Sequence, residues 1–227
     1  MDHLSTSGTG NGVDVGVFRQ PQDGLHRRQS EYGLSEFDVQ HRFVASAVWF
    51  IPFGHGQKFG NNSPKAVDLL LGGWEFSPIA SAQTGMGLTV TQSCTINLGG
   101  EMTCRPNRLA NGAVPDSARS VDNWIDAAAF QLLQPNPSQA GFTPNQVYGN
   151  SGVGILRGPG MFNIDFNQSK SFAISERHLL QFRAEFFNAL NHSNFSVPGT
   201  NLSAGFGQIT STSTEARIIQ FAVKYRF

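Results

Sequence analysis

The last stretch of the chain, ARIIQFAVKYRF at residues 216–227, alternates apolar and polar side chains. Every second residue is apolar, in the series Ile219, Phe221, Val223, Tyr225 and Phe227. Successive side chains of a β-strand point to opposite faces, so a period of two predicts a strand with one apolar and one polar face. The sequence therefore ends in a two-faced β-strand.

The same alternation recurs upstream, in residues 42–51, 74–83, 162–167 and 178–187. Most of these runs reach the length of about 9 to 11 residues that a tilted strand needs to cross a membrane. Ordinary strands average roughly 5 to 6 residues. We expect residues 88–91 to continue the hairpin that begins at residue 74. Stretches rich in Gly, Pro, Asn and Ser separate the runs and predict long loops.

One short helix is predicted at residues 121–133, where Asp122 stands as the N-cap before WIDAAAF. The predicted fold class is therefore all-β and antiparallel, with long loops and at most one short helix.

No run approaches the roughly 20 apolar residues of a transmembrane helix. The first residues carry no basic start and no apolar core, so no signal peptide is encoded here. Either the protein is cytoplasmic or the chain is a piece of a longer precursor.

Composition and motifs argue against several classes of function. Lys plus Arg and Asp plus Glu each number 16, so the formal charge is zero and a nucleic-acid partner is not expected. The six histidines are scattered without metal-ligand spacing, and no nucleophile or phosphate-loop motif occurs. We expect no enzyme activity, no metal and no cofactor. Cys94 and Cys104 flank a Gly-rich stretch and are predicted to form a loop disulfide, with two free thiols as the alternative.

Two kinds of fold produce such strands. In a soluble β-sandwich the apolar faces pack on each other, and in an outer-membrane barrel they meet lipid while the polar faces line the lumen. Aromatic residues near strand ends, among them Trp49, Trp74 and Phe186, resemble an interfacial girdle. We expect charged residues on the polar faces to line a lumen and to form cross-strand ion pairs, although a catalytic carboxylate pair is conceivable. These residues are Asp165, Arg183, Glu185, Lys224 and Arg226.

Four motifs resemble the TonB-dependent receptors of the Oar-like kind. They are YGLSEFDVQHRFVASAVWFIPFG (32–54), LLGGWEFSPIASAQTGMGLTV (70–90), YGNSGVGILRGPGMFNIDFNQSKSF (148–172) and LLQFRAEFFNALNHSNF (179–195). The terminal ARIIQFAVKYRF also resembles the last strand of outer-membrane barrel proteins. The resemblance covers about residues 30 to 227, and the motifs stand in the family's order.

The resemblance implies the C-terminal strands of a larger barrel in the outer membrane, with residues 1–30 as a lead-in and 31–227 as barrel. It implies energy-coupled uptake of a large nutrient, of siderophore, oligosaccharide or peptide class, with ligand-facing loops at 94–111 and 134–150. The alternating apolar residues that end in Phe227 would be the insertion signal read by the barrel assembly machinery. TonB would act through a plug absent from this chain, so we expect a fragment. A soluble β-sandwich that binds carbohydrate or another ligand is the alternative function.

Overall fold

The computed structural model describes residues 22, 27–93, 104–134, 148–175 and 177–227. Two compact units interleave along the chain. The first, here called the loop unit, comprises Met1–Gln40, Thr84–Gly160 and Phe195–Ser211. The second, the sheet unit, comprises His41–Gln83, Met161–Asn194 and Thr212–Phe227. Each unit is described by itself.

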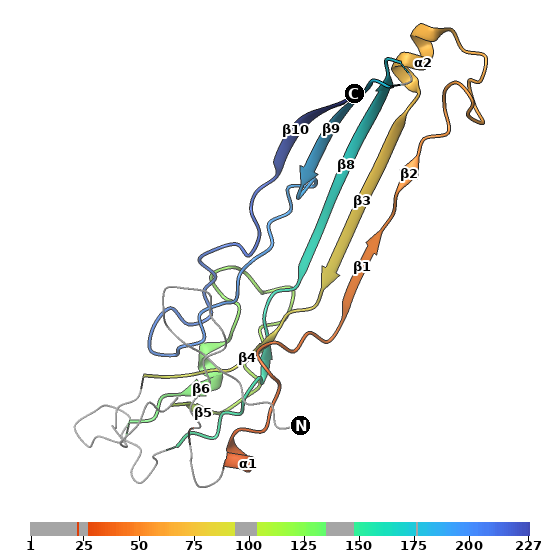
Figure 1. Ribbon diagram of the computed structural model, residues 1–227. Coiled ribbons are helices and arrows are strands. Elements are labelled where there is room, and N and C mark those ends of the chain that lie inside the picture. Colours follow the sequence, from red (N-terminus) through yellow and green to blue (C-terminus); the bar gives the residue numbers. More distant parts are fainter. Residues whose placement is uncertain (1–21, 23–26, 94–103, 135–147, 176) are drawn as a thin grey trace. The chain divides into compact units, whose positions relative to one another are not determined.

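All strands of the sheet unit belong to one antiparallel sheet, with the order β1-β3-β8-β9-β10 (Figure 1). The strands are β1 (Arg42–Ser46), β2 (Trp49–Phe50), β3 (Trp74–Gln83), β8 (Met161–Ala173), β9 (Leu179–Phe187) and β10 (Ile218–Arg226). The short β2 pairs with β3 and continues the line of β1. Strands β1 and β10 form the two edges, so the sheet is open within the described residues.

The strand register keeps the apolar positions of neighbouring strands in phase. Phe166 in β8 lies opposite Phe186 in β9, and Ala184 in β9 lies opposite Phe221 in β10. Directly opposed residues of antiparallel strands project to the same side of the sheet. The alternation read from each strand separately therefore adds up to one apolar face and one polar face across the sheet.

The predicted strand at residues 42–51 is interrupted between β1 and β2, and Pro78 explains the break. Ala47 donates its backbone N–H to the Pro78 carbonyl at 3.2 Å, as expected for a hydrogen-bonded antiparallel pair. The reciprocal bond cannot form because proline has no N–H. Pairing resumes at Trp49, which lies opposite Phe76.

A seven-residue helix that the sequence did not predict, α2 (Lys65–Leu71), lies between β2 and β3. It follows Pro64, and Gly72 ends it by donating its backbone N–H to the Asp68 carbonyl at 2.8 Å. Figure 1 shows α2 at the same end of the sheet as the C-terminus. No helix in the described part of the chain is both long and apolar enough to span a membrane.

The loop unit is built from short elements around a small core. One turn of helix, α1 (Arg27–Ser30), precedes two short strand pairs, β4 (Gly87–Leu88) with β7 (Leu156–Arg157) and β5 (Asn107–Arg108) with β6 (Phe130–Gln131). A single 3₁₀ turn, η1 (Ala127–Ala129), leads into β6. The core cluster consists of Leu88, Val90, Ile125, Ala129, Phe130 and Leu156.

Two local predictions were wrong. Residues 121–133 do not form an α-helix: only η1 is helical, and its cap is Asp126, whose carboxylate accepts a hydrogen bond from Ala128 N at 3.0 Å. Packing of Ile125, Ala129 and Phe130 into the core outweighs the helix propensity of the alanines. Residues 88–91 do not extend the β3 hairpin either, because Leu88 and Val90 are buried in the loop unit, with 4% and 0% exposed.

Candidate functional site

The apolar face of the sheet is made of large side chains from every strand. Its members, read from the register, include Phe43, Trp49, Trp74, Phe76, Phe162, Ile164, Phe166, Phe172, Leu180, Phe182, Phe186, Ile219, Phe221, Val223 and Tyr225. Many are open to the surroundings; Phe221 is 69% exposed and Val223 is 67% exposed. Contiguous exposed apolar surface of this kind marks contact with a partner or with a membrane.

Aromatic rings link four strands on this face. The Phe76 and Phe166 ring centroids lie 5.3 Å apart, and Phe166 stacks on Phe186 at 4.4 Å. Phe182 stacks on Phe221 at 6.0 Å. Such contacts stabilise ring pairs by about 0.5–1.5 kcal/mol beyond the burial of their area. The face is thus ordered by its own side chains although its outer surface is uncovered.

Two polar residues of β8 interrupt the apolar face, and both are satisfied by backbone carbonyls. Gln168 Nε2 donates to Glu75 O at 3.1 Å, and Lys170 Nζ donates to Gly72 O. The Lys170 ammonium also lies 5.2 Å from the Trp74 ring centroid and 4.9 Å from that of Phe172. Lys170 is only 4% exposed, so its ammonium is enclosed by the Gly72 carbonyl and these two rings.

The sequence did not single out Lys170. The signal for it was its parity, because Lys170 falls on the same alternate positions of β8 as Phe166 and Phe172. At the same end of the sheet, Tyr225 stacks on His178 and its hydroxyl lies 2.6 Å from His178 Nδ1. Rings with one polar end suit a position where apolar and wet surroundings meet.

The opposite face of the sheet is polar. The register places Asp165, Arg183, Glu185, Lys224 and Arg226 on it. Asp165 accepts hydrogen bonds from Asn188 N and from Asn163 Nδ2, both at 2.8 Å. The ion pairs expected across strands are replaced by a pair along β9, where Arg183 Nη1 lies 3.4 Å from Glu185 Oε1. The reason is the register: Arg183 lies opposite Ser169 and Ala222, and neither carries a charge.

The aromatic residues predicted to form a girdle lie at different levels of the sheet. Trp74 begins β3 and donates its indole N–H to Leu70 O at 2.9 Å. Trp49 lies near the same end, opposite Phe76. Phe186 is level with Phe166, in the middle part of the longest strand. Phe227 follows β10 and is 93% exposed. The insertion role assigned to the terminal alternating residues stays a prediction.

The loop unit contains a buried ion pair that the sequence did not reveal. Arg105, with 1% of its side chain exposed, places Nη1 2.8 Å from Glu31 Oε2, and its Nη2 donates to Ser30 O at 2.6 Å. Gln22 ties the same region together, accepting from Arg105 N at 2.8 Å and donating to Gly149 O at 2.8 Å. These partners are far apart in sequence, so no local sequence pattern predicts the contacts between them.

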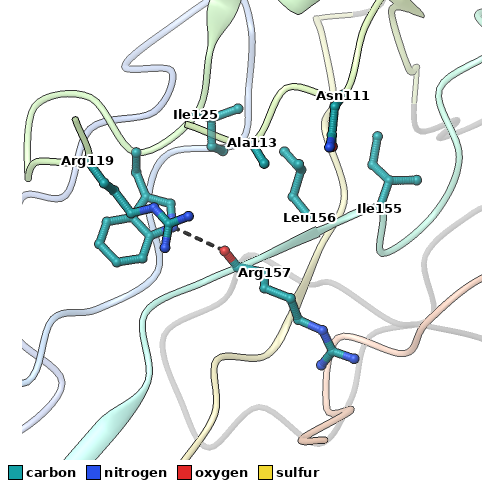
Figure 2. Close-up of a pocket in the computed structure, with 8 residues that line it drawn as sticks. Asn111, Ala113, Arg119, Ile125, Ile155, Leu156 and Arg157 are labelled. Carbon is teal, nitrogen blue, oxygen red and sulfur yellow. Dashed lines mark hydrogen bonds between the residues drawn. The ribbon is translucent and has the colours of Figure 1, made fainter. Parts of the chain in front are cut away.

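The loop unit also has a pocket of about 200 Å³, lined by Asn111, Ala113, Arg119, Trp124, Ile125, Ile155, Leu156 and Arg157 (Figure 2). The Arg119 guanidinium lies 4.9 Å from the Trp124 ring centroid. The Trp124 indole N–H donates to Arg157 O at 3.1 Å, the bond dashed in Figure 2. The pocket is smaller than the roughly 300 Å³ at which ligand sites usually begin. We assign it no ligand.

Cys104 is disulfide-bonded, while its predicted partner Cys94 lies outside the described residues, so the pairing stays a prediction. Much of the predicted ligand-facing loops, residues 94–103 and 135–147, also lies outside them. Within the described ranges, no group of three or more His, Cys, Asp and Glu side chains could hold a metal ion. The division of the chain at residue 30 is not tested by the structure.

The long connections leave one end of the sheet. Gln83 and Met161, which bracket the connection 84–160, lie opposite each other, as do Phe187 and Ile218, which bracket 188–217. At the other end, β8 and β9 are joined by the short connection 174–178, β2 and β3 are joined by residues 51–73, which include α2, and β10 ends. The two longest connections thus share one end, and in outer-membrane barrels the longer loops lie outside and the shorter turns on the periplasmic side.

The comparisons with known proteins agree with this arrangement. A family model described as an outer membrane beta barrel domain matches residues 1–220. Searches of curated proteins and of solved structures find no significant match. The soluble sandwich is not favoured, because every strand of the sheet unit lies in a single sheet whose apolar face is open. The predicted all-β barrel class is confirmed, and the chain belongs to the outer membrane beta barrel domain family, acting in contact with the lipid bilayer of the outer membrane.

Proposed function

We propose that this chain forms part of the wall of an outer-membrane receptor of the TonB-dependent, Oar-like kind, which takes up a large nutrient. The observation that carries the proposal is the sidedness of the sheet: the two longest connections, 84–160 and 188–217, leave one end, while the other end carries the shorter 51–73 and 174–178. In barrels the long loops face outward and meet the ligand, while short turns face the periplasm. The four motifs resemble those of TonB-dependent receptors, and this resemblance implies that uptake is coupled to TonB through a plug.

The open sheet supports the same proposal. Backbone N–H and C=O groups at the free edges of β1 and β10 cost several kcal/mol each if they stay unpaired in lipid. A closed wall therefore needs strands beyond the described sheet. A large receptor barrel supplies them.

The test is uptake by cells that carry the full-length gene product. Radiolabelled ferric siderophores, oligosaccharides and peptides would be offered to the wild type, to a strain lacking the gene and to a strain lacking TonB. We expect one class of compound to be taken up by the wild type only. Uptake that needs the gene but survives the loss of TonB would contradict energy coupling and indicate a passive channel.

We also propose that the terminal residues Ile219, Phe221, Val223, Tyr225 and Phe227 are read by the barrel assembly machinery. Phe227 is 93% exposed, and within the described part of the chain its one ring contact is with Tyr225, at 5.9 Å, so its deletion removes little packing. Deleting it should still lower the outer-membrane level of the protein several-fold, measured by immunoblotting of membrane fractions. Phe227→Tyr, which keeps a terminal aromatic ring, is the matched control, and unchanged levels in both variants would contradict the proposal.

The proposal gives the chain no catalytic activity. The carboxylate of Asp165 is occupied by Asn188 and Asn163, and that of Glu185 lies beside Arg183. Asp165→Asn and Glu185→Gln should therefore leave transport measurable in the uptake assay. Loss of a hydrolytic activity on the transported compound in either variant would show that these groups act as catalysts.

A further inference from the structure

Helix α2 exposes three consecutive leucines. Leu69 is 56% exposed, Leu70 is 68% exposed and Leu71 is 48% exposed. The helix is amphipathic: Val67, Leu70 and Leu71 follow the i, i+3, i+4 spacing of one stripe, while Lys65 and Asp68, three apart, form a charged stripe. In water an exposed apolar stripe of this kind is unfavourable and promotes aggregation, so it indicates contact with a partner or a membrane.

The charged stripe is turned toward the preceding turn of the sheet unit. Asp68 Oδ1 accepts a hydrogen bond from His55 N at 2.6 Å. The fit is close, because a Cβ placed on Gly54 or on Gly72 would lie 2.5 or 2.6 Å from that same oxygen. Asp68 therefore fixes the rotation of α2, and Leu70, two residues further along, lies on the opposite side of the helix from this anchor.

The C-terminal end of α2 is tied to the apolar face of the sheet. Trp74, which belongs to that face, donates its indole N–H to Leu70 O at 2.9 Å. Lys170, on the same face, donates to Gly72 O and lies over the Trp74 ring. The exposed Leu70 and Leu71 thus continue the apolar face beyond the start of β3, with Trp74 and Lys170 at the junction.

We propose that α2 is an interfacial helix whose leucine stripe, Leu70 and Leu71 together with Val67, rests on membrane phospholipid at the end of the sheet that carries the short connection 174–178. The partner is lipid because the stripe is continuous with the lipid-contacting face of the barrel domain. Amphipathic helices of this kind lie in the membrane plane with their apolar face about 5–10 Å into the boundary between head groups and acyl chains. Tryptophan and lysine are the residues that anchor such a boundary.

The sidedness of the barrel places α2 at the periplasmic leaflet. Short turns of outer-membrane barrels lie on the periplasmic side, and α2 shares its end of the sheet with such a turn. The phospholipid head groups of that leaflet lie at the level of Lys170. This inference does not depend on which compound the receptor transports.

The test is photo-crosslinking of the full-length protein in outer membranes of cells whose phospholipids carry ³²P. A benzoyl-phenylalanine replaces Leu70 in one variant and Lys65, on the charged stripe of the same helix, in a second. Phe221 and Gln220, on opposite faces of β10, provide the lipid-facing reference and its control. We expect a ³²P-labelled adduct at position 70 at least five-fold stronger than at position 65, and a similar contrast between positions 221 and 220.

Other outcomes overturn the proposal. An adduct at position 221 without one at position 70 would show that the leucine stripe does not touch lipid. An adduct to a polypeptide at position 70 would make α2 a protein-docking helix instead. Equal labelling at positions 65 and 70 would contradict the rotation that Asp68 imposes. Failure at position 221 as well would remove the continuity argument and the proposal with it.

Discussion

The two units of this chain place their apolar side chains in opposite ways. In the loop unit they point inward: Leu88, Val90, Ile125 and Phe130 are almost fully buried. In the sheet unit the apolar residues cover an outer face, and β10 is exposed along its whole length. The loop unit therefore encloses its apolar side chains in a core of its own, whereas the sheet unit presents them on a face, as a sheet in contact with lipid does. The hydrophobic effect drives both arrangements, and the surroundings determine whether apolar side chains point inward or outward.

The charged groups follow the same contrast. The loop unit buries the Arg105–Glu31 pair, which a water-facing fold tolerates when both partners are hydrogen-bonded. In the sheet unit the charged side chains lie mainly on the polar face. Lys170, on the apolar face, lies near a strand end and donates to the Gly72 carbonyl. A single charge at the centre of the apolar face should therefore be far more harmful than one on the polar face.

The largest expected effect concerns the buried pair. Arg105→Ala leaves the Glu31 carboxylate buried without its partner, which costs about 3–5 kcal/mol. Hydrogen exchange of loop-unit amides such as Leu109 N should report that loss in local opening free energy, while β9 amides stay unchanged. Replacing both partners, Arg105→Met with Glu31→Leu, should recover much of the loss. An equal drop in both units would show that they do not unfold separately.

A charge on the apolar face comes next. Phe221→Arg should lower the free energy of unfolding in phospholipid vesicles by about 2–4 kcal/mol, the range for a cation at the bilayer midplane. Gln220→Arg is the matched control, since it adds the same side chain one residue away on the polar face, opposite Glu185. Equal costs for the two variants would mean that both faces of β10 meet the same environment.

The smallest effect is expected at the surface of the loop unit. Asp116 is 91% exposed and lies 2.9 Å from Arg119 Nη1. Exposed ion pairs contribute about 0–1 kcal/mol, so Asp116→Ala should change the opening free energy of the loop unit by less than about 1 kcal/mol. A much larger loss, measured by the same hydrogen exchange, would show that the Arg119 side chain depends on this pair to stay over Trp124.

The sequence predicted the sheet better than the loops for a physical reason. Within each strand, apolar and polar residues alternate, and this local pattern was enough to locate β3, β9 and β10 without tertiary information. Pro78 could have been recognised as a break, because its missing N–H is a local property. Helix α2 has only seven residues, and it is held in place by Trp74, Lys170 and His55, which lie outside it.

The loop unit was not predictable in the same way. Its core joins residues 88–90 to 125–130 and 156, and its ion pair joins residue 31 to residue 105. Contacts between such distant segments leave no periodic trace in a single sequence. Residues 121–133 show the consequence: the alanines that favour a helix form only the single 3₁₀ turn η1, and Phe130 after them is buried and pairs with Arg108.

The most direct test of the central claim is the accessibility of spin labels placed at each residue of β10, Ile218 to Arg226, in the full-length protein in phospholipid vesicles. If one face of this strand meets lipid, accessibility to oxygen should oscillate with a period of two and peak at 219, 221, 223 and 225. Accessibility to a water-soluble nickel chelate should oscillate in the opposite phase. Uniform accessibility to both reagents, or two signals in phase, would contradict the account.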